Sequence, residues 1–97
     1  MTGYYLYIVQ CRDNTLYTGT AKNLEARIDQ HNAGKGAKYI RGRRPVTLVY
    51  SETLKNKNEA LRREHEIKKW SRTRKLQLIA EANVQGSSLQ PGSPNGV

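Results

Sequence analysis

Two polar side chains lie on a predicted helix face that should be apolar. Leu24, Ile28 and His31 recur at the spacing i, i+4, i+7. Arg27 lies at the edge of this stripe, one turn before His31. An arginine can form a forked pair with phosphate oxygens, and a histidine, with an ordinary pKa of about 6.5, can orient a neighbour or relay a proton. The plainer interpretation of His31 is a hydrogen-bonded histidine of the core.

Glu64 is likewise a polar residue on the apolar face of a second predicted helix. At about 100° per residue, the apolar stripe of that helix is set by Ala60, Leu61 and Ile67, and Glu64 falls between the first two. A carboxylate in such a place is costly unless it pairs with a cation or binds a metal. Glu64 is therefore either an ion-pair partner, for instance of Arg27, or a hard oxygen ligand for a divalent cation.

Two tyrosines, Tyr7 and Tyr17, lie on predicted strands that a short turn at residues 12–14 connects. A two-residue loop of Asp13 and Asn14 would place the tyrosines on opposite faces of the sheet. A three-residue loop with Asn14 in the left-handed conformation would place both on one face. We predict the odd-length loop. Taken singly, both tyrosines are ordinary strand residues.

The segments that must position these residues follow the order ββαβαα. Strands are predicted at residues 4–11, 15–20 and 46–51, and helices at 23–32, 57–70 and from 72 onward. Asn23 and Ser71 are suitable N-cap residues. Residues 4–11 are apolar on both faces, which is typical of a central strand. The pattern predicts an α+β domain.

One folded domain is predicted at residues 1–82, followed by a disordered tail at residues 83–97. The tail has no Lys, Arg, Asp or Glu and is dominated by Gly, Ser, Pro, Asn and Gln. Such a composition buries too little apolar surface to offset the entropy of ordering the chain. The domain is small, so one thin core has to position the candidate residues.

The formal charge of +9 lies entirely within residues 1–82. This excess favours a polyanionic partner, which is DNA, RNA or an anionic membrane. A membrane fits less well, because no apolar run approaches the roughly 18 residues that span a bilayer and no signal peptide is recognisable. The single cysteine, Cys11, has no intrachain disulfide partner. These features predict a cytoplasmic protein that binds nucleic acid.

Residues 33–45 are predicted to form a basic loop with three glycines and no acid. Such a loop can follow a phosphate backbone but offers no fixed frame for reading bases. Tyr39 can stack on a base, and Lys22, next to the second strand, can touch a phosphate. For any single residue, a solvated loop is the alternative. The loop cations assigned to nucleic-acid binding are Lys35, Lys38, Arg41, Arg43 and Arg44.

Four fragments, in order along the chain, resemble the GIY-YIG nuclease superfamily. The first motif reads Tyr5-Leu6-Tyr7 and the second reads Tyr17-Thr18-Gly19. Residues 20–32 resemble the family's helix that carries an arginine and, four residues on, a histidine. Residues 59–69 resemble the helix that bears the metal-binding glutamate. The resemblance spans about residues 4–79 and is closest to the small stand-alone bacterial (YhbQ-like) members.

The resemblance implies a three-stranded antiparallel sheet flanked by three helices, and hydrolysis of phosphodiester bonds with one divalent cation, Mg²⁺ or Mn²⁺. Glu64 would be the metal ligand, and Arg27 would offset charge on the phosphate. The proton of the attacking water needs an acceptor, and a tyrosine serves only if positive charge lowers its pKa from about 10. Either tyrosine could be that acceptor. The implied catalytic set is Tyr7, Tyr17, Arg27, His31 and Glu64.

The function expected from this resemblance is an endonuclease in repair or recombination, with DNA favoured over RNA as the substrate and RNA left open. The alternative is a catalytically weak or inactive module of the same fold that binds DNA or RNA. Two departures from the family pattern bear on this choice. Thr20 occupies a place where excision-repair relatives carry a lysine. Trp70-Ser71-Arg72 stands where some members have an asparagine after the glutamate helix.

Overall fold

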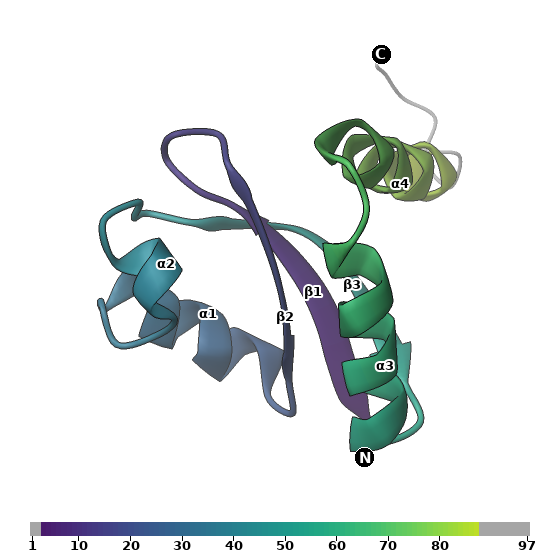
Figure 1. Cartoon of the computed structure of the whole chain (residues 1–97), viewed down its shortest axis with the longest axis horizontal. Coiled ribbons are helices and arrows are strands. Elements are labelled where there is room, and N and C mark those ends of the chain that lie inside the picture. The colour runs from purple at the N-terminus through teal and green to yellow at the C-terminus, as the bar shows by residue number, and fades with distance from the viewer. Residues whose placement is uncertain (1–2, 88–97) are drawn as a thin grey trace.

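The chain folds around a three-stranded antiparallel sheet, shown in Figure 1 as a computed structural model that describes residues 3–87. The strands are β1 (Tyr4–Gln10), β2 (Leu16–Ala21) and β3 (Thr47–Leu54), in the spatial order β2-β1-β3. β1 occupies the centre because both of its faces are apolar and buried. The α+β fold with a three-stranded antiparallel sheet is as predicted.

Four helices flank the sheet in the described part of the chain. They are α1 (Leu24–Asn32), α2 (Lys38–Arg41), α3 (Lys57–Lys68) and α4 (Arg72–Ser87). The two predicted caps are present, because the Asn23 side chain accepts from the Ala26 N–H at 3.0 Å and Ser71 Oγ accepts from the Arg74 N–H at 3.2 Å. The short helix α2 differs from the prediction, since it lies within residues 33–45, which were expected to be a loop throughout.

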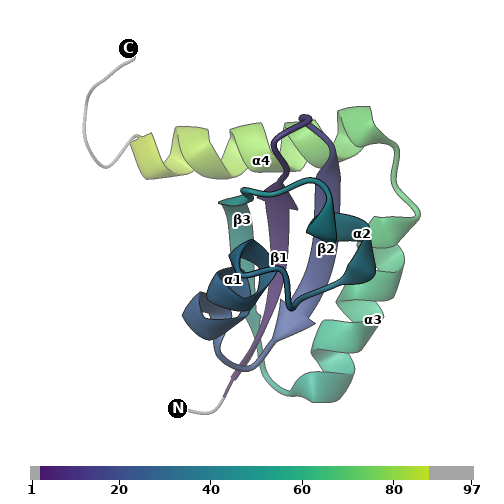
Figure 2. The same ribbon diagram turned by 90° about the vertical axis from the view of Figure 1, so that its left-hand side faces the viewer.

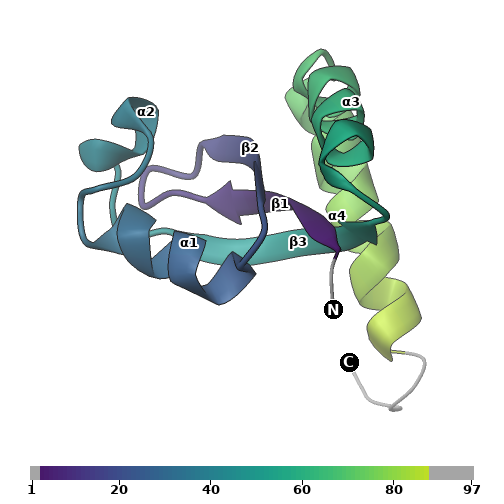
Figure 3. The same cartoon turned by 90° about the horizontal axis from the view of Figure 1, so that it is seen from below.

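The helices cover opposite faces of the sheet. Figure 3 shows α1 and α2 on one side and α3 and α4 on the other, with the strands between them. Tyr7 and Val9 lie in the core on the α1–α2 side, and Leu6 and Ile8 pack with Ile67 on the α3–α4 side. Figure 2 shows α3 running alongside β2, while α4 crosses one end of the sheet. This arrangement brings α1 and α3 to the same two strands from different sides.

The turn between β1 and β2 has odd length, as predicted. Asn14 has a φ of 70°, in the left-handed region, and the loop comprises residues 12–14. Tyr7 pairs with Gly19, and Tyr17 pairs with the residue two positions after Tyr7. Odd-numbered residues of β1 therefore pair with odd-numbered residues of β2. The two tyrosine rings lie on one face of the sheet, with centroids 6.5 Å apart.

The stripe of α3 that faces the sheet is shifted from the one predicted. Ala60 and Ile67 are fully buried, but Leu61 is 42% exposed. Ala60, Glu64 and Ile67 follow the spacing i, i+4, i+7, so they share one face of the helix and Leu61 is turned away from it. Glu64 therefore lies in the middle of the sheet-facing stripe, where its side chain is 18% exposed.

α4 packs one side against the sheet and extends beyond residue 82. Leu78 and Ile79 pack against the core on the α3–α4 side of the sheet, whereas Leu76 is 41% exposed. The helix runs to Ser87, so it includes residues 83–87 of the predicted tail, whereas residues 88–97 lie outside the described residues. Within residues 3–87, no helix is long and apolar enough to cross a bilayer.

Candidate active site

A pocket of about 340 Å³ brings together all five residues of the predicted catalytic set. β1 and β2 supply the two tyrosines, α1 supplies Arg27 and His31, and α3 supplies Glu64. The odd-length turn is what allows both tyrosines to reach the same pocket. The other residues that line it are Gly19, Thr20, Lys35, Gly36 and Ala37.

Tyr7 and Gly19 contact each other at the base of the pocket. They are paired across β1 and β2, and Tyr7 is only 2% exposed. A Cβ atom at position 19 would lie 2.6 Å from the Tyr7 hydroxyl oxygen and 2.8 Å from its Cζ atom, well inside van der Waals contact. Position 19 is therefore glycine because the tyrosine ring needs the space.

His31 is held between Tyr7 and the backbone of Ala37. Its Nε2 atom lies 2.7 Å from the Tyr7 hydroxyl oxygen, and the Ala37 N–H donates to its Nδ1 atom at 3.4 Å. His31 is 1% exposed, so the interpretation as a hydrogen-bonded buried histidine holds. Its partner, however, is one of the two tyrosines that the motifs single out.

Tyr7 and His31 are both uncharged at neutral pH. Burial, followed by the positive charge of Arg27, lowers the pKa of His31. Burial is also the largest cause that raises the pKa of Tyr7 well above its ordinary value. Tyr17 and Glu64 raise the pKa of Tyr7 further, and Arg27 lowers it. The pair therefore consists of a neutral imidazole and a neutral phenol.

Arg27 lines the pocket without a carboxylate partner among residues 3–87. Its Nη1 atom donates to Gln30 Oε1 at 3.3 Å, within the same helix. The alternative that Glu64 is the ion-pair partner of Arg27 is wrong, because Glu64 pairs with another residue. The remaining guanidinium donors are available to an anion in the pocket.

Glu64 pairs with Lys68, one helical turn further along α3. The Lys68 Nζ atom lies 3.0 Å from Glu64 Oε2 and 5.7 Å from the centroid of the Tyr17 ring. The Lys68 side chain is 49% exposed. Lys68 is a further residue of the site, and the only sign of it in the sequence is the i, i+4 spacing that permits this pair.

The pocket can accommodate a metal ion that keeps most of its water. Residues 3–87 hold no group of three or more His, Cys, Asp or Glu that could bind a metal by themselves. Glu64 offers one hard oxygen ligand beside open space, and Mg²⁺ commonly uses one or two carboxylates and keeps several waters. Its partner Lys68 is half-exposed and can move away at little cost. Glu64 is thus the residue able to hold a divalent cation here.

Several predicted nucleic-acid-binding residues surround the pocket. Lys35 lines it. Tyr39 of α2 stacks on Tyr17, with centroids 5.9 Å apart and an angle of 26° between the rings. Arg43 lies over the Tyr39 ring at 4.2 Å and pairs with Asp13 of the β1–β2 turn at 3.1 Å. Arg43 is therefore already in an ion pair, whereas the sequence suggests a cation that is free to bind phosphate.

The other predicted cations occupy different surfaces. Arg41 and Arg44 line a second hollow of about 400 Å³ together with Arg12, a cation outside the predicted set. Arg12 comes close because its backbone N–H donates to the carbonyl of Arg43 at 2.9 Å. Lys38 is exposed on α2. Lys22 lines a separate hollow rather than the pocket.

A comparison with known protein families assigns the chain to one of them. A family model described as the GIY-YIG catalytic domain matches residues 3–77, a range that contains every residue lining the pocket. The chain belongs to the GIY-YIG family, which is a family of nucleases. The resemblance predicted from the motifs is confirmed.

Similar bacterial proteins carry names that state no activity. The UPF0213 protein SH2523 of Staphylococcus haemolyticus is 60% identical over 81 residues, which are 84% of this chain and 99% of that protein. The UPF0213 protein SSP2268 of Staphylococcus saprophyticus is 58% identical over the same shares of the two chains.

Two structures solved by NMR in solution are also similar. The UPF0213 protein BH0048 of Bacillus halodurans has a TM-score of 0.53 and 45% identity, covering 80% of this chain and 83% of that one. The protein EF2693 of E. faecalis has a TM-score of 0.60 and 31% identity, covering 87% and 90%. The fold is therefore shared with small proteins of similar length.

Proposed function

We propose that this protein is an endonuclease that hydrolyses phosphodiester bonds of DNA with one divalent cation, Mg²⁺ or Mn²⁺. The observation that supports it most is the meeting of Arg27, Glu64 and the hydrogen-bonded Tyr7–His31 pair in one pocket, beside exposed cations. The family supplies the class of reaction. A role in DNA repair or recombination is part of the proposal.

Arg27 is the group that would bind the scissile phosphate. Its guanidinium can form a forked pair with two phosphate oxygens. Negative charge on those oxygens increases as the attacking water bonds to phosphorus and the bond to the 3′ oxygen breaks. A guanidinium fixed in the pocket stabilises that charge in the transition state more than in the ground state.

Glu64 would act in two ways. It would hold the divalent cation, which when bound stabilises charge on the phosphate and on the departing 3′ oxygen. Its own negative charge is also one of the causes that raise the pKa of Tyr7. Neutralising the carboxylate therefore makes the Tyr7 hydroxyl easier to deprotonate.

Tyr7 is the better candidate for accepting the proton of the attacking water. Its hydroxyl is hydrogen-bonded to His31 at 2.7 Å. Burial is the largest influence on the pKa of Tyr7 and raises it, and the charge of Arg27 acts in the opposite direction. Tyr17 contributes chiefly through its ring, which packs edge-on against His31 and stacks on Tyr39. Once Tyr7 has lost its own proton, its oxygen can take one from the water.

Substitution of the two charged residues tests the proposal. Glu64→Gln and Arg27→Ala are each expected to reduce cleavage by at least about a hundredfold while DNA binding is kept. The substrates are branched, nicked and single-stranded DNA, with RNA as a fourth, each with Mg²⁺ or Mn²⁺. Cleavage that is unchanged in both variants comes from a contaminant, and the proposal would then be rejected.

Nucleic-acid binding is tested separately from cleavage. Lysine and arginine contacts to phosphates release counterions, so the affinity of the Glu64→Gln variant for DNA should fall steeply as salt is raised. A control titration uses a neutral oligonucleotide analogue of the same sequence. An affinity for DNA that stays constant from low to moderate salt contradicts binding through the phosphate backbone.

A second candidate function is a nucleic-acid-binding module with little or no turnover. Two observations favour it. Lys68 forms an ion pair with the Glu64 carboxylate, and burial holds the pKa of Tyr7 well above its ordinary value. This candidate predicts that the wild-type protein and Glu64→Gln bind DNA or RNA equally well. It also predicts that neither protein cleaves any substrate of the panel.

A further inference from the structure

We infer that the backbone of Gly36 and Ala37 fixes the tautomer of His31, so that its Nε2–H donates to Tyr7 and the hydroxyl proton of Tyr7 points into the pocket. Gly36 and Ala37 are then positioning residues for the proton acceptor of the reaction. The catalytic meaning of this inference rests on the proposed function, but the tautomer itself does not.

The tautomer follows from the partners of the two ring nitrogens. The Ala37 N–H is a donor, and it points at His31 Nδ1 across 3.4 Å. A ring nitrogen that accepts a hydrogen bond carries no proton, and a neutral imidazole carries only one. His31 is 1% exposed, and the nearby charge of Arg27 also opposes protonation. The single ring proton is therefore on Nε2.

The position of that proton decides what His31 can do for Tyr7. Nε2 lies 2.7 Å from the Tyr7 oxygen, so the Nε2–H donates and the tyrosine oxygen accepts. His31 in this tautomer has no free lone pair with which to remove the Tyr7 proton. That proton has to pass to solvent water through the pocket, which Arg27 and Glu64 line. His31 then stabilises the phenolate by donating a hydrogen bond to it.

Gly36 makes this arrangement possible. A Cβ atom at position 36 would overlap Nδ1 of His31 and would also press on Cε1 and Cγ of the ring. With glycine, the backbone lies directly against the imidazole and brings the Ala37 N–H within reach of Nδ1. No such requirement exists at Gly42, further along the same segment, where an added Cβ would meet nothing within 4 Å.

The same backbone also connects the site to the surface expected to contact nucleic acid. Gly36 and Ala37 lie between Lys35, which lines the pocket, and α2, whose Tyr39 stacks on Tyr17. A bound strand that touches Lys35 or Tyr39 therefore touches the segment that orients His31. Binding and proton transfer share these two backbone residues.

Nitrogen-15 NMR of the histidine rings tests the inference directly, because protonated and unprotonated ring nitrogens differ in chemical shift. At pH 7.5, His31 of the wild-type protein is expected to show a protonated Nε2 and an unprotonated Nδ1. The exposed His65 should instead average over both tautomers and serves as the internal reference. Protonation of His31 at Nδ1 would overturn the inference.

The variants Gly36→Ala and Gly42→Ala form a matched pair. Gly36→Ala should displace the ring, move the His31 shifts toward the averaged values of His65, and reduce any cleavage by about tenfold or more. Gly42→Ala should keep the wild-type His31 spectrum. A His31 spectrum that is unchanged in Gly36→Ala would show that the segment does not set the tautomer.

The variant Tyr7→Phe removes one hydrogen-bond partner of His31, the Tyr7 hydroxyl, and keeps the other, the Ala37 N–H. It provides a test even if Gly36→Ala fails to fold. If Ala37 fixes the tautomer, Nδ1 stays unprotonated after the hydroxyl is removed. Protonation of Nδ1 in Tyr7→Phe would assign the tautomer to Tyr7 and overturn the inference. A wild-type protein that cleaves nothing but gives the expected spectra would reject the proposed function alone.

Discussion

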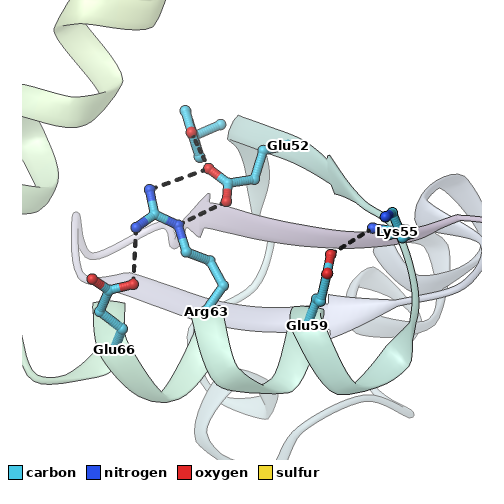
Figure 4. A network of polar contacts seen from close by, with 6 residues as sticks. Glu52, Lys55, Glu59, Arg63 and Glu66 are labelled. Atoms are coloured by element: carbon cyan, nitrogen blue, oxygen red, sulfur yellow. Dashed lines mark hydrogen bonds and ion pairs between the residues drawn. The ribbon is translucent and has the colours of Figure 1, made fainter.

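Arg27 and Arg63 lie on helices that pack beside the same sheet, yet their surroundings are opposite. Figure 4 shows Arg63 of α3 held by Glu52 and Glu66. Its Nε and Nη2 atoms donate to the two oxygens of Glu52 at 2.7 and 3.4 Å, and its Nη1 donates to Glu66 at 3.1 Å. Within residues 3–87, Arg27 donates to the neutral side chain of Gln30 and pairs with no carboxylate.

The difference shows how to distinguish a structural charge from one available to a ligand. The hydrogen bond to Glu52 is the largest cause that raises the pKa of Arg63, and the Tyr50 hydroxyl also donates to Glu52. A phosphate could bind Arg63 only by breaking this network. Arg27 has no such bonds to lose, so binding an anion there costs far less. The partners of each arginine, and not its charge alone, indicate its role.

The largest expected effect is the loss of cleavage when Arg27 is replaced. Arg27→Ala should reduce cleavage by at least about a hundredfold, because the transition-state charge loses its guanidinium. Its thermal midpoint should stay near that of the wild type. Cleavage rates under single-turnover conditions and a thermal melt of the same preparation measure both quantities. A variant that melts early but cleaves normally would reverse the assignment of the two arginines.

Arg63→Ala should do the opposite and act on stability. Loss of a forked, partly buried pair with Glu52 should lower the free energy of unfolding by about 1–3 kcal/mol. The cleavage rate of the folded fraction should change little. Urea titrations measure the stability, with the exposed neighbour Arg62→Ala as control. Equal stability of the two variants would mean that the network contributes nothing measurable.

A smaller effect is expected when stability is measured against pH. Burial and Arg27 lower the pKa of His31 in the folded state below its unfolded value of about 6.5. As the pH falls through that value, the unfolded chain binds more protons than the folded one. Stability is therefore complete above about pH 6.5 and decreases below it, by roughly 1.4 kcal/mol for each unit of pKa difference.

Urea titrations at pH 7.5 and 5.5 measure this dependence. In His31→Gln, the difference in stability between the two pH values should be largely removed. The variant His65→Gln is the control, because that histidine is exposed. A pH dependence that survives in His31→Gln and disappears in His65→Gln would contradict the role of burial at position 31.

The smallest effect is expected at Lys68. Lys68→Met frees the Glu64 carboxylate from an exposed ion pair, which is worth less than about 1 kcal/mol, so Mn²⁺ should bind about twofold more tightly. Electron paramagnetic resonance of free Mn²⁺ measures the affinity without any cleavage. Lys69→Met, next along the same helix and exposed, controls for the loss of one positive charge. If Mn²⁺ affinity increased equally in both variants, the increase would be due to the change in net charge and not to the loss of the Glu64–Lys68 ion pair.

The fold could be predicted from the sequence because local signals and chain topology agree. The apolar faces of residues 4–11 indicated the central strand, and Asn14 indicated the odd-length turn that places Tyr7 and Tyr17 together. α2 could not be predicted in this way. It is a single turn of helix whose Ile40 is fully buried, and its position depends on the core that it enters.

The members of the pocket were predictable, whereas their partners were not. Helical spacing placed Arg27 and Glu64 on faces that packing alone would not choose. The sequence alone could not decide that Glu64 pairs with Lys68, since Arg27 was also a possible partner and only the structure shows which cation lies within reach. The contact of Ala37 with His31 was also hidden, because it is made by a backbone N–H.

Gly19 offers a way to sort the relatives of this chain by sequence. Even a methyl group at that position would overlap the Tyr7 hydroxyl, so a relative with a side chain there cannot keep its tyrosine in reach of the histidine. We expect such relatives to have lost proton transfer while retaining the fold and the surface cations. If the proposed function is correct, the residue at this position of β2 would distinguish relatives that are able to cleave from relatives that only bind.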